Sequence, residues 1–227
     1  MTTSKRLGLF ERTVQSLSLI NFQGCIDRCC IIDDHSSPGD LQKMAEILSR
    51  LNVPTTIISS PNDGPRRHVH AMNIWLELIS AEEFVFHCED DWEFDTKRTL
   101  LPMFRWGIGV LRDHEWIGQA CFRKIEHRTT SPNPYEEFWV RTVANCPEDP
   151  NWASHPGHWP SRFTLTPTVT RVASLKGLGS FEEVDHFEKV FGLKWVEAGW
   201  TTVYHNSAWC RHIGEGQSAY QINGSIH

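Results

Sequence analysis

The sequence has no long hydrophobic run and no excess of positive charge, and both absences narrow the class of protein. No segment approaches the roughly 20 apolar residues of a membrane-spanning helix, and the first residues show no signal-peptide core. The net charge is −6 without a basic stripe, which argues against nucleic acid or an anionic membrane as the main partner. We therefore expect a cytoplasmic protein with no transmembrane segment and no nucleic-acid partner.

Cysteine motifs and repeats are also missing. No Cys-x-x-Cys pair exists, which excludes the usual structural zinc ribbon. The seven cysteines are odd in number and several lie in apolar runs, so buried reduced thiols are favoured over a disulfide framework. No internal repeat or linker divides the chain, and a single domain over 1–227 is the prediction.

What the sequence does contain is an alternation of helix and strand patterns, with 40% hydrophobic and 22% charged residues. This order predicts an α/β fold with a mainly parallel, doubly wound central sheet flanked by helices. The expected helices cover about 8–19, 36–48, 69–79, 96–112 and 182–198. The expected strands cover 29–32, 53–59, 84–86, 116–122, 163–170 and 200–204.

Between 124 and 161 the chain becomes polar, rich in Pro, Asn, Trp and His, and without a clear period. Such a long irregular stretch in a compact domain is typical of a functional loop or lid. It forms the beginning of the second half of the domain, 124–227, which follows a first half, 1–123.

Two acidic clusters follow predicted parallel strands, Asp33-Asp34 and Glu89-Asp90-Asp91. Either cluster alone also fits a solvated turn or a helix cap. Ligands gather at the carboxyl ends of parallel strands, and adjacent like charges repel unless something positive lies among them. Carboxylate oxygens suit Mn²⁺ or Mg²⁺, which bind through one or two carboxylates and substrate phosphates. The two clusters together therefore predict a metal-assisted site for a nucleoside diphosphate.

An ordered set of short motifs covers nearly the whole chain. The motifs are Thr2-Thr3-Ser4-Lys5-Arg6, Ile31-Ile32-Asp33-Asp34-His35-Ser36-Ser37, His87-Cys88-Glu89-Asp90-Asp91-Trp92, Trp159-Pro160, Gly179-Ser180-Phe181, His186-Phe187-Glu188, Ala198-Gly199-Trp200 and His212-Ile213-Gly214. In this order they resemble the family-2-like glycosyltransferases of the GT-A fold. One departure is the apolar first strand, which is almost absent before Thr2-Thr3: either the chain starts late in that strand or the sheet is trimmed.

The resemblance implies one GT-A domain whose first half binds a nucleotide-diphosphate sugar and whose second half binds an acceptor. Asp34 would accept a hydrogen bond from the base, with Thr3 and Arg6 lining the same pocket. Asp90 or Glu89 would face ribose or water. The residues implied in donor binding are Thr3, Arg6, Asp33, Asp34, Asn73, Glu89 and Asp90.

For the metal, Mn²⁺ or Mg²⁺, the resemblance implies Asp91 and His212 as ligands. Glu188 would be the general base of an inverting transfer, with Phe187 turned into the core. Acidic residues are also favoured at the start of a helix because they interact with the helix dipole, so this carboxylate could simply stabilise the helix. Asp185 is the alternative base. The implied acceptor contacts are His158, Trp159 and Asp185; the acceptor itself is unknown.

Scattered histidines at 68, 70, 155 and 158 are a weak pattern for zinc. Trp75 and Trp195 lie at helical positions typical of core, whereas the loop residues Trp92, Trp152 and Trp159 are better placed for sugar contact.

Two other functions stay open. A nucleotidyltransferase could use the same kind of sheet and metal, but it normally carries a Gly-rich phosphate loop, which is missing here. A non-catalytic carbohydrate-binding protein would need neither the paired acidic clusters nor a metal.

Overall fold

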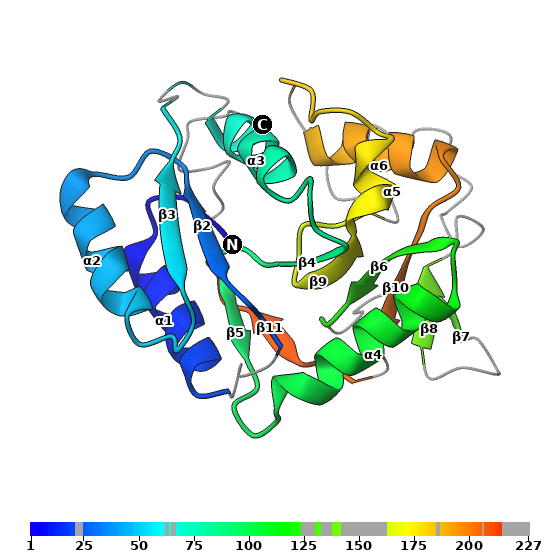
Figure 1. Cartoon of the computed structure of the whole chain (residues 1–227), viewed down its shortest axis with the longest axis horizontal. Helices are drawn as coiled ribbons and strands as arrows, with labels where there is room; N and C mark the ends of the chain where they lie inside the picture. Colours follow the sequence, from blue (N-terminus) through cyan, green and yellow to red (C-terminus); the bar gives the residue numbers. More distant parts are fainter. Residues whose placement is uncertain are drawn as a thin grey trace.

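The computed structural model describes residues 1–20, 25–61, 64, 67–123, 130–132, 138–141, 163–184, 187–205 and 207–214, with backbone alone for 130–132 and 138–141. The helices are α1 (Leu7–Ser18), α2 (Pro38–Leu48), α3 (Arg67–Leu78), α4 (Leu100–Asp113), α5 (Val172–Lys176) and α6 (Phe187–Glu197) (Figure 1). The strands are β1 (Thr2–Thr3), β2 (Cys29–Asp33), β3 (Thr55–Ser59), β4 (Phe84–His87), β5 (Trp92–Phe94), β6 (Ile117–Cys121), β7 (Thr130–Pro132), β8 (Phe138–Arg141), β9 (Thr168–Arg171), β10 (Thr201–His205) and β11 (Cys210–His212). None of the helices in these described ranges has the length and apolar character needed to cross a membrane.

The first sheet is parallel throughout, in the order β1-β2-β3. Its strand β2 is short, and its buried residues Ile31 and Ile32 point to opposite faces, as alternation along a strand requires. The helix α2 begins where the sequence predicts, because the Ser37 hydroxyl caps the Asp40 N–H and Pro38 occupies the first turn.

The second sheet has the order β4-β9-β6-β10-β8-β7 and is mixed. Only β6 and β10 pair in parallel, and every other pair in this sheet is antiparallel. The α/β class is confirmed, and among the described strands the parallel ladders are those of the first sheet and of the β6–β10 pair. Strands of both halves of the chain share this sheet, since β4 pairs with β9 and β6 with β10.

The two sheets meet at β1. Thr2 forms a parallel bridge with Glu89, and its N–H donates to the Cys88 carbonyl over 3.1 Å. The carboxyl ends of β1, β2 and β4 therefore lie side by side along one edge, where the acidic clusters were expected.

Three segments differ from the sequence-based expectation. The strand expected over 163–170 is shorter, because Thr164 and Leu165 bond to side chains of Gln119 and Glu188 instead of joining a ladder. The short helix α5 follows β9 directly and was not predicted. The helix expected from 182 begins only at Phe187, and the irregular stretch at 124–161 contains the paired strands β7 and β8.

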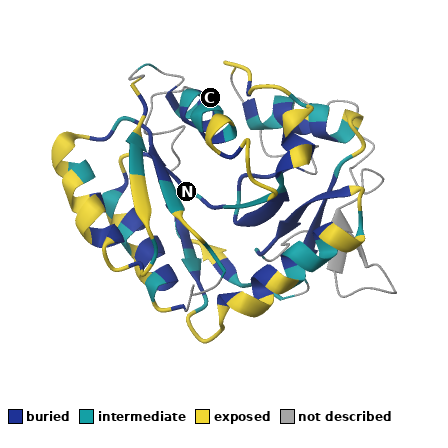
Figure 2. Ribbon diagram, in the orientation of Figure 1, coloured by how far each residue is buried: buried dark blue, intermediate teal, exposed yellow. Residues whose placement is uncertain are grey.

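Apolar side chains form two core clusters on opposite faces of the sheets. One includes Phe10, Ile31 and Phe104, and the other includes Ile32, Phe163 and Phe191. Figure 2 shows β6 and nearly all of β10 buried, while β3 is exposed or half-buried and the outer side of α2 is exposed.

Gly118 in β6 gives a test of this packing. A Cβ atom there would lie 2.3 Å from the Trp195 ring, which is fully buried, so the ring has nowhere to move. We predict that Gly118→Ala lowers the free energy of unfolding by about 1–3 kcal/mol, the usual cost of overpacking. In the matched control Gly109→Ala, on α4, nothing lies within 4 Å of the new Cβ. Urea melts should show the control unchanged or more stable; equal effects would contradict the Gly118–Trp195 contact.

Candidate functional site

Arg6 lies at the centre of the acidic edge. It follows β1 by a turn in which Lys5 adopts the left-handed conformation, with φ of 50°. The turn directs the guanidinium back onto the second acidic cluster, where Nη2 pairs with Asp90 and Nη1 lies 2.8 Å from Asp91 Oδ2. Arg6 and both carboxylates are buried, so one cation holds two anions that would otherwise repel each other.

Both carboxylate oxygens of Asp90 bind other groups of the protein. Its Oδ2 accepts hydrogen bonds from the Thr3 hydroxyl at 2.8 Å and the Ser4 N–H at 3.1 Å, while Oδ1 pairs with Arg6. No part of Asp90 is exposed. These contacts tie the turn after β1 to the end of β4, so both Thr3 and Asp90 serve this connection in the structure.

Asp91 faces the other way, toward β11. Its Oδ2 lies 3.2 Å from His212 Nε2, and its carbonyl accepts the Ile213 N–H. Burial alone would raise the pKa of Asp91, but the His212 contact and the Arg6 charge hold that pKa below its usual range. Gly214 passes so close that a Cβ there would lie 2.6 Å from Asp91 Oδ2. The buried Asp91 Oδ1 accepts no hydrogen bond from the residues that the structure describes.

The residues around Asp91 fit a divalent cation that arrives with a phosphate ligand. Asp91 and His212 are adjacent donors, and Asp91 Oδ1 has an unused lone pair. Within the described ranges no group of three or more His, Cys, Asp or Glu side chains could hold a metal alone. Mg²⁺ and Mn²⁺ commonly take one or two carboxylates and complete their shell with substrate phosphates and water.

Asp34 is buried at the end of β2, next to β1. Its Oδ2 accepts the Ser4 hydroxyl at 3.2 Å, and its Oδ1 lies 3.2 Å from Arg67 Nε without an aligned hydrogen bond. Burial raises the pKa of Asp34 to about 6, although the Arg67 charge acts in the opposite direction. Asp34 therefore keeps an acceptor oxygen that the described protein groups do not fully use.

Two other candidates have structural partners. Asp33 Oδ2 accepts the Ser36 N–H and the Ser59 hydroxyl, which closes the turn after β2. The Asn73 amide pairs with both backbone groups of Phe181, donating at 3.0 Å and accepting at 2.8 Å. In this structure Asp33 Oδ2 shapes the edge, while its buried Oδ1 accepts no hydrogen bond from the described residues. Asn73 fixes the segment before α6.

Glu89 is half-buried and lies opposite α6. Its pKa is raised well above the ordinary value by burial, and then by the charges of Asp91 and Glu188. His68 Nε2 lies 4.0 Å from Glu89 Oε1. Burial lowers the pKa of His68 to about 4, so this imidazole is neutral near pH 7 and gives Glu89 no compensating charge.

Glu188 lies in the first turn of α6, and its neighbour Phe187 is buried in the core as expected. Glu188 Oε1 accepts the Leu165 N–H at 3.1 Å, and the Leu165 carbonyl lies 2.9 Å from His87 Nδ1. Burial raises the pKa of Glu188, and the Arg123 charge partly offsets this. The Leu165 N–H thus holds Glu188 Oε1, and the Glu188 charge is close enough to Glu89 to help raise the pKa of Glu89.

Exposure separates the groups that a ligand can reach from those that it cannot. Asp34 and Asp90 are inaccessible, whereas Glu89, Glu188 and His212 are partly exposed. A ligand can therefore touch Asp34 only after a neighbouring group such as Arg67 moves. Asp185, His158 and Trp159 lie outside the described residues, as do Trp152 and most of the stretch 124–161.

Several residues of the edge were missed by sequence reasoning. Ser4, Arg67 and the Leu165 peptide each contact a candidate side chain. Arg67 had a sequence signal, because a basic residue close to a predicted helix start can pair with a buried carboxylate. Leu165 had none, because its contribution comes from backbone atoms.

The chain is similar to known proteins in its three-dimensional structure and not in its sequence. No family model and no curated protein sequence matches the chain. S. aureus TarS 1–349 matches with 18% identity and a TM-score of 0.58, over 92% of this chain and 58% of that one; a TarS structure in complex with UDP is equally similar. Mannosyltransferase PcManGT from Pyrobaculum calidifontis, in complex with GDP-Man and Mn²⁺, matches with 15% identity and a TM-score of 0.58, over 97% and 59%.

A third match is 4-diphosphocytidyl-2C-methyl-D-erythritolsynthase from Anaerococcus prevotii, with 11% identity and a TM-score of 0.51, over 99% and 93% of the two chains. Identities this low show the fold alone. The chain has the GT-A fold that the sequence predicts, which it shares with nucleotide-sugar glycosyltransferases. It spans little more than half the length of the TarS 1–349 and PcManGT chains.

The pKa of Asp34 gives a prediction for stability. Because burial raises this pKa from 3.8 to about 6, the stability that Asp34 contributes is full below about pH 4 and is lost as the pH rises through 6. Asp34→Asn removes this titration. Relative to wild type, the variant should gain about 2–3 kcal/mol in free energy of unfolding between pH 4 and pH 7. Urea melts at both values test this, with Asp113→Asn at the exposed end of α4 as control. A difference that does not change with pH would contradict a buried Asp34 carboxyl.

Proposed function

We propose that the protein is a metal-dependent glycosyltransferase, which moves a sugar from a nucleotide-diphosphate sugar to an acceptor hydroxyl with inversion. The observation that supports this most directly is Asp91, a buried carboxylate with an unused oxygen beside His212, at the ligand edge of a GT-A fold. The neighbours with this fold were solved with UDP, UDP-GlcNAc and GDP-Man, which supports a nucleotide-sugar donor here.

In this proposal the donor diphosphate lies against Asp91 and His212. Arg6 positions Asp91, while Thr3, Asp34 and Glu89 belong to the surrounding nucleotide pocket. Bound Mn²⁺ or Mg²⁺ would act as a Lewis acid that stabilises the negative charge on the departing diphosphate. The fixed positions of Asp91 and His212 orient the donor before transfer.

The acceptor side is assigned to Glu188. As the acceptor oxygen forms its bond to the anomeric carbon, the bond from that carbon to the diphosphate oxygen breaks. The hydroxyl proton passes to the Glu188 carboxylate, and the nucleoside diphosphate leaves with the bonding electrons. The raised pKa of Glu188 suits a base that works near neutral pH. His158, Trp159 and Asp185 remain proposed acceptor contacts.

Nucleotidyl transfer is the second candidate, because the erythritol synthase spans the same fold over nearly its whole length. The two reactions release different products from a nucleotide substrate. Transfer or hydrolysis of a nucleotide sugar releases a nucleoside diphosphate, whereas nucleotidyl transfer from a nucleoside triphosphate releases pyrophosphate. A panel of both substrate types, with and without Mn²⁺, distinguishes them, and pyrophosphate release alone would overturn the proposal.

The metal assignment predicts a loss of binding. Asp91→Asn removes a hard anionic ligand, so Mn²⁺-dependent affinity for nucleoside diphosphate should fall at least about 100-fold, and His212→Ala should cost about 10-fold. Titration calorimetry with UDP and GDP, with and without Mn²⁺, measures this. Asp113→Asn should bind as wild type does. Full Mn²⁺-dependent affinity in Asp91→Asn, with an unchanged melting temperature, would remove Asp91 from the metal site.

The base assignment predicts a loss of rate without a loss of donor affinity. The Glu188→Gln side chain still accepts the Leu165 N–H but cannot take a proton, so transfer should fall about 10²–10⁴-fold while nucleotide affinity stays within a few-fold. Glu183→Gln, an exposed position just before α6, is the matched control. Normal transfer by Glu188→Gln together with an inactive Asp185→Asn would move the base to Asp185. Activity in both variants would exclude this inverting mechanism.

A further inference from the structure

His68 and Glu89 face each other close to the start of α6. His68 lies in the first turn of α3, and Glu89 follows β4. The His68 ring lies 5.4 Å from the ring of Phe187, the first residue of α6, so α3 and α6 approach each other here. The side chains of His68 and Glu89 are 15% and 26% exposed, so a ligand can reach both.

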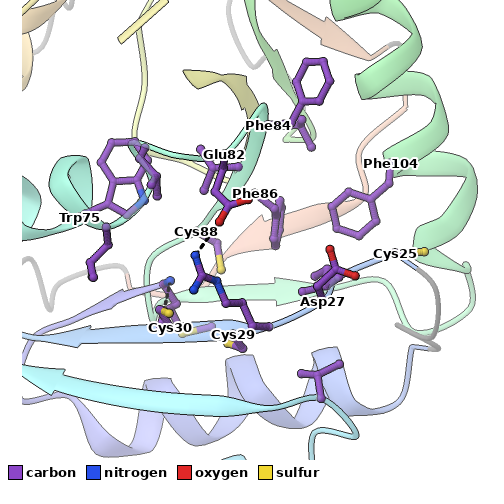
Figure 3. Close-up of a pocket in the computed structure, with 18 of the residues that line it drawn as sticks. Cys25, Asp27, Cys29, Cys30, Trp75, Glu82, Phe84, Phe86, Cys88 and Phe104 are labelled. Carbon is purple, nitrogen blue, oxygen red and sulfur yellow. Dashed lines mark hydrogen bonds and ion pairs between the residues drawn. The ribbon is translucent and has the colours of Figure 1, made fainter. Parts of the chain in front are cut away.

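Packing along α3 fixes the place of His68. Trp75 lies about two helical turns further along and therefore on the same face of α3. It lines the cavity that Figure 3 shows, and its ring lies 5.0 Å from the ring of His87 at the end of β4. His87 and Glu89 are alternate residues of an extended segment and share one side of it. The face of α3 that carries Trp75 and His68 is thus held against His87 and Glu89.

The two polar side chains leave a gap of defined size. His68 Nε2 lies 4.0 Å from Glu89 Oε1, which is too long for a direct hydrogen bond. One oxygen atom fits between them at about 2.8 Å from each, with an angle of about 90° at that oxygen. Polar atoms at such a separation are commonly bridged by a water or by a ligand hydroxyl.

His68 is a neutral donor in this gap. Burial lowers its pKa to about 4, so the imidazole carries a single proton near pH 7. His68 Nδ1 is buried and has no hydrogen-bond partner among the described residues. A buried N–H without a partner is rarer than a buried acceptor without one, so the proton belongs on Nε2.

The group that fills the gap must accept from His68 Nε2–H and donate to Glu89 Oε1. A hydroxyl does both through one oxygen atom. A phosphate oxygen only accepts and would be repelled by the Glu89 carboxylate, and an amide N–H only donates. The gap therefore fits a hydroxyl group.

The surroundings of Glu89 indicate which hydroxyl this is. The charges of Asp91 and Glu188 both raise the pKa of Glu89, so Glu89 lies close to the proposed metal ligand and to the proposed base. In the proposed transfer the anomeric carbon lies between the diphosphate at Asp91 and the acceptor oxygen at Glu188. The sugar ring of the donor then passes the gap.

We propose that His68 and Glu89 bind one free hydroxyl of the donor sugar and thereby select the sugar. The proposal rests on the proposed function and assigns Glu89 to the sugar end of the donor pocket. A donor with this hydroxyl replaces the contacts of the bridging water, whereas a donor without it leaves Nε2–H and Oε1 unpaired. His68 is thus a specificity-determining residue that contacts the sugar and not the nucleotide.

The first test compares nucleotide sugars with nucleoside diphosphates. Titration calorimetry with Mn²⁺ gives the Kd of UDP, UDP-glucose, UDP-GlcNAc, GDP and GDP-mannose, and the ratio of the two Kd values gives the contribution of each sugar. His68→Phe keeps a ring against Phe187 but should lower this contribution about 5–10-fold for the preferred donor, with diphosphate binding unchanged. His68→Gln keeps a side-chain N–H near the Nε2 position and should stay within about twofold. His70→Gln, on another face of α3, is the matched control.

The second test removes the hydroxyl instead of the imidazole. Monodeoxy analogues of the preferred donor are titrated into the wild type and into His68→Phe. One analogue should bind the wild type about 5–10-fold more weakly than the parent donor does. The same analogue should bind His68→Phe no more weakly than the wild type, because both changes remove the same contact.

The outcomes separate this proposal from the proposed function. Equal weakening of diphosphate and nucleotide sugar by His68→Phe, or additive losses for every analogue, overturns the role of His68 and leaves the transferase in place. Wild-type protein that binds every monodeoxy analogue as tightly as the parent also overturns it, whatever the stability of the variant. Absence of Mn²⁺-dependent binding for all five nucleotides overturns both.

Discussion

The buried contact of Arg6 with Asp90 and Asp91 is the interaction on which the candidate site depends. Two adjacent carboxylates at the end of a buried strand repel each other, and burial strengthens that repulsion. One guanidinium with two donor faces matches this geometry better than an ammonium group would. Because Arg6 follows β1 and the carboxylates follow β4, the ion pair also joins the two sheets at the ligand edge.

Asp90 and Asp91 have different partners at that edge. Asp90 is turned inward to Thr3, Ser4 and Arg6, and Asp91 is turned toward His212 with one oxygen unused. Asp90 therefore has all its polar contacts within the protein, whereas the buried Asp91 Oδ1 accepts no hydrogen bond from the described residues. At present Arg6 supplies the positive charge that faces Asp91. A metal ion that arrives with a diphosphate would add a second positive charge there.

Elements with a strong local signal could be predicted from the sequence, and so could the edge on which the acidic residues meet. The apolar spacing of Leu7, Phe10 and Val14 predicted α1, and Ser37-Pro38 predicted the start of α2. The antiparallel entry of β9 between β4 and β6 could not be predicted, because strand direction depends on long-range pairing and not on the pattern within 168–171. The same holds for Asn73, whose amide found Phe181 across the fold, and for Leu165, which acts through its peptide group.

The two core clusters on opposite sheet faces have a consequence for how substitutions combine. Phe10 and Phe191 belong to different clusters, with the strands between them. Distant sites without shared neighbours contribute additively to the free energy of unfolding, whereas neighbours within one cluster do not. A double-mutant cycle across the sheet should therefore show almost no coupling energy, and a cycle within one face, such as Phe181 with Phe191, should show a large one. Residues as far apart as Phe10 and Phe191 can therefore be repacked independently of each other, whereas Leu17 and Trp75, which line one cavity, cannot.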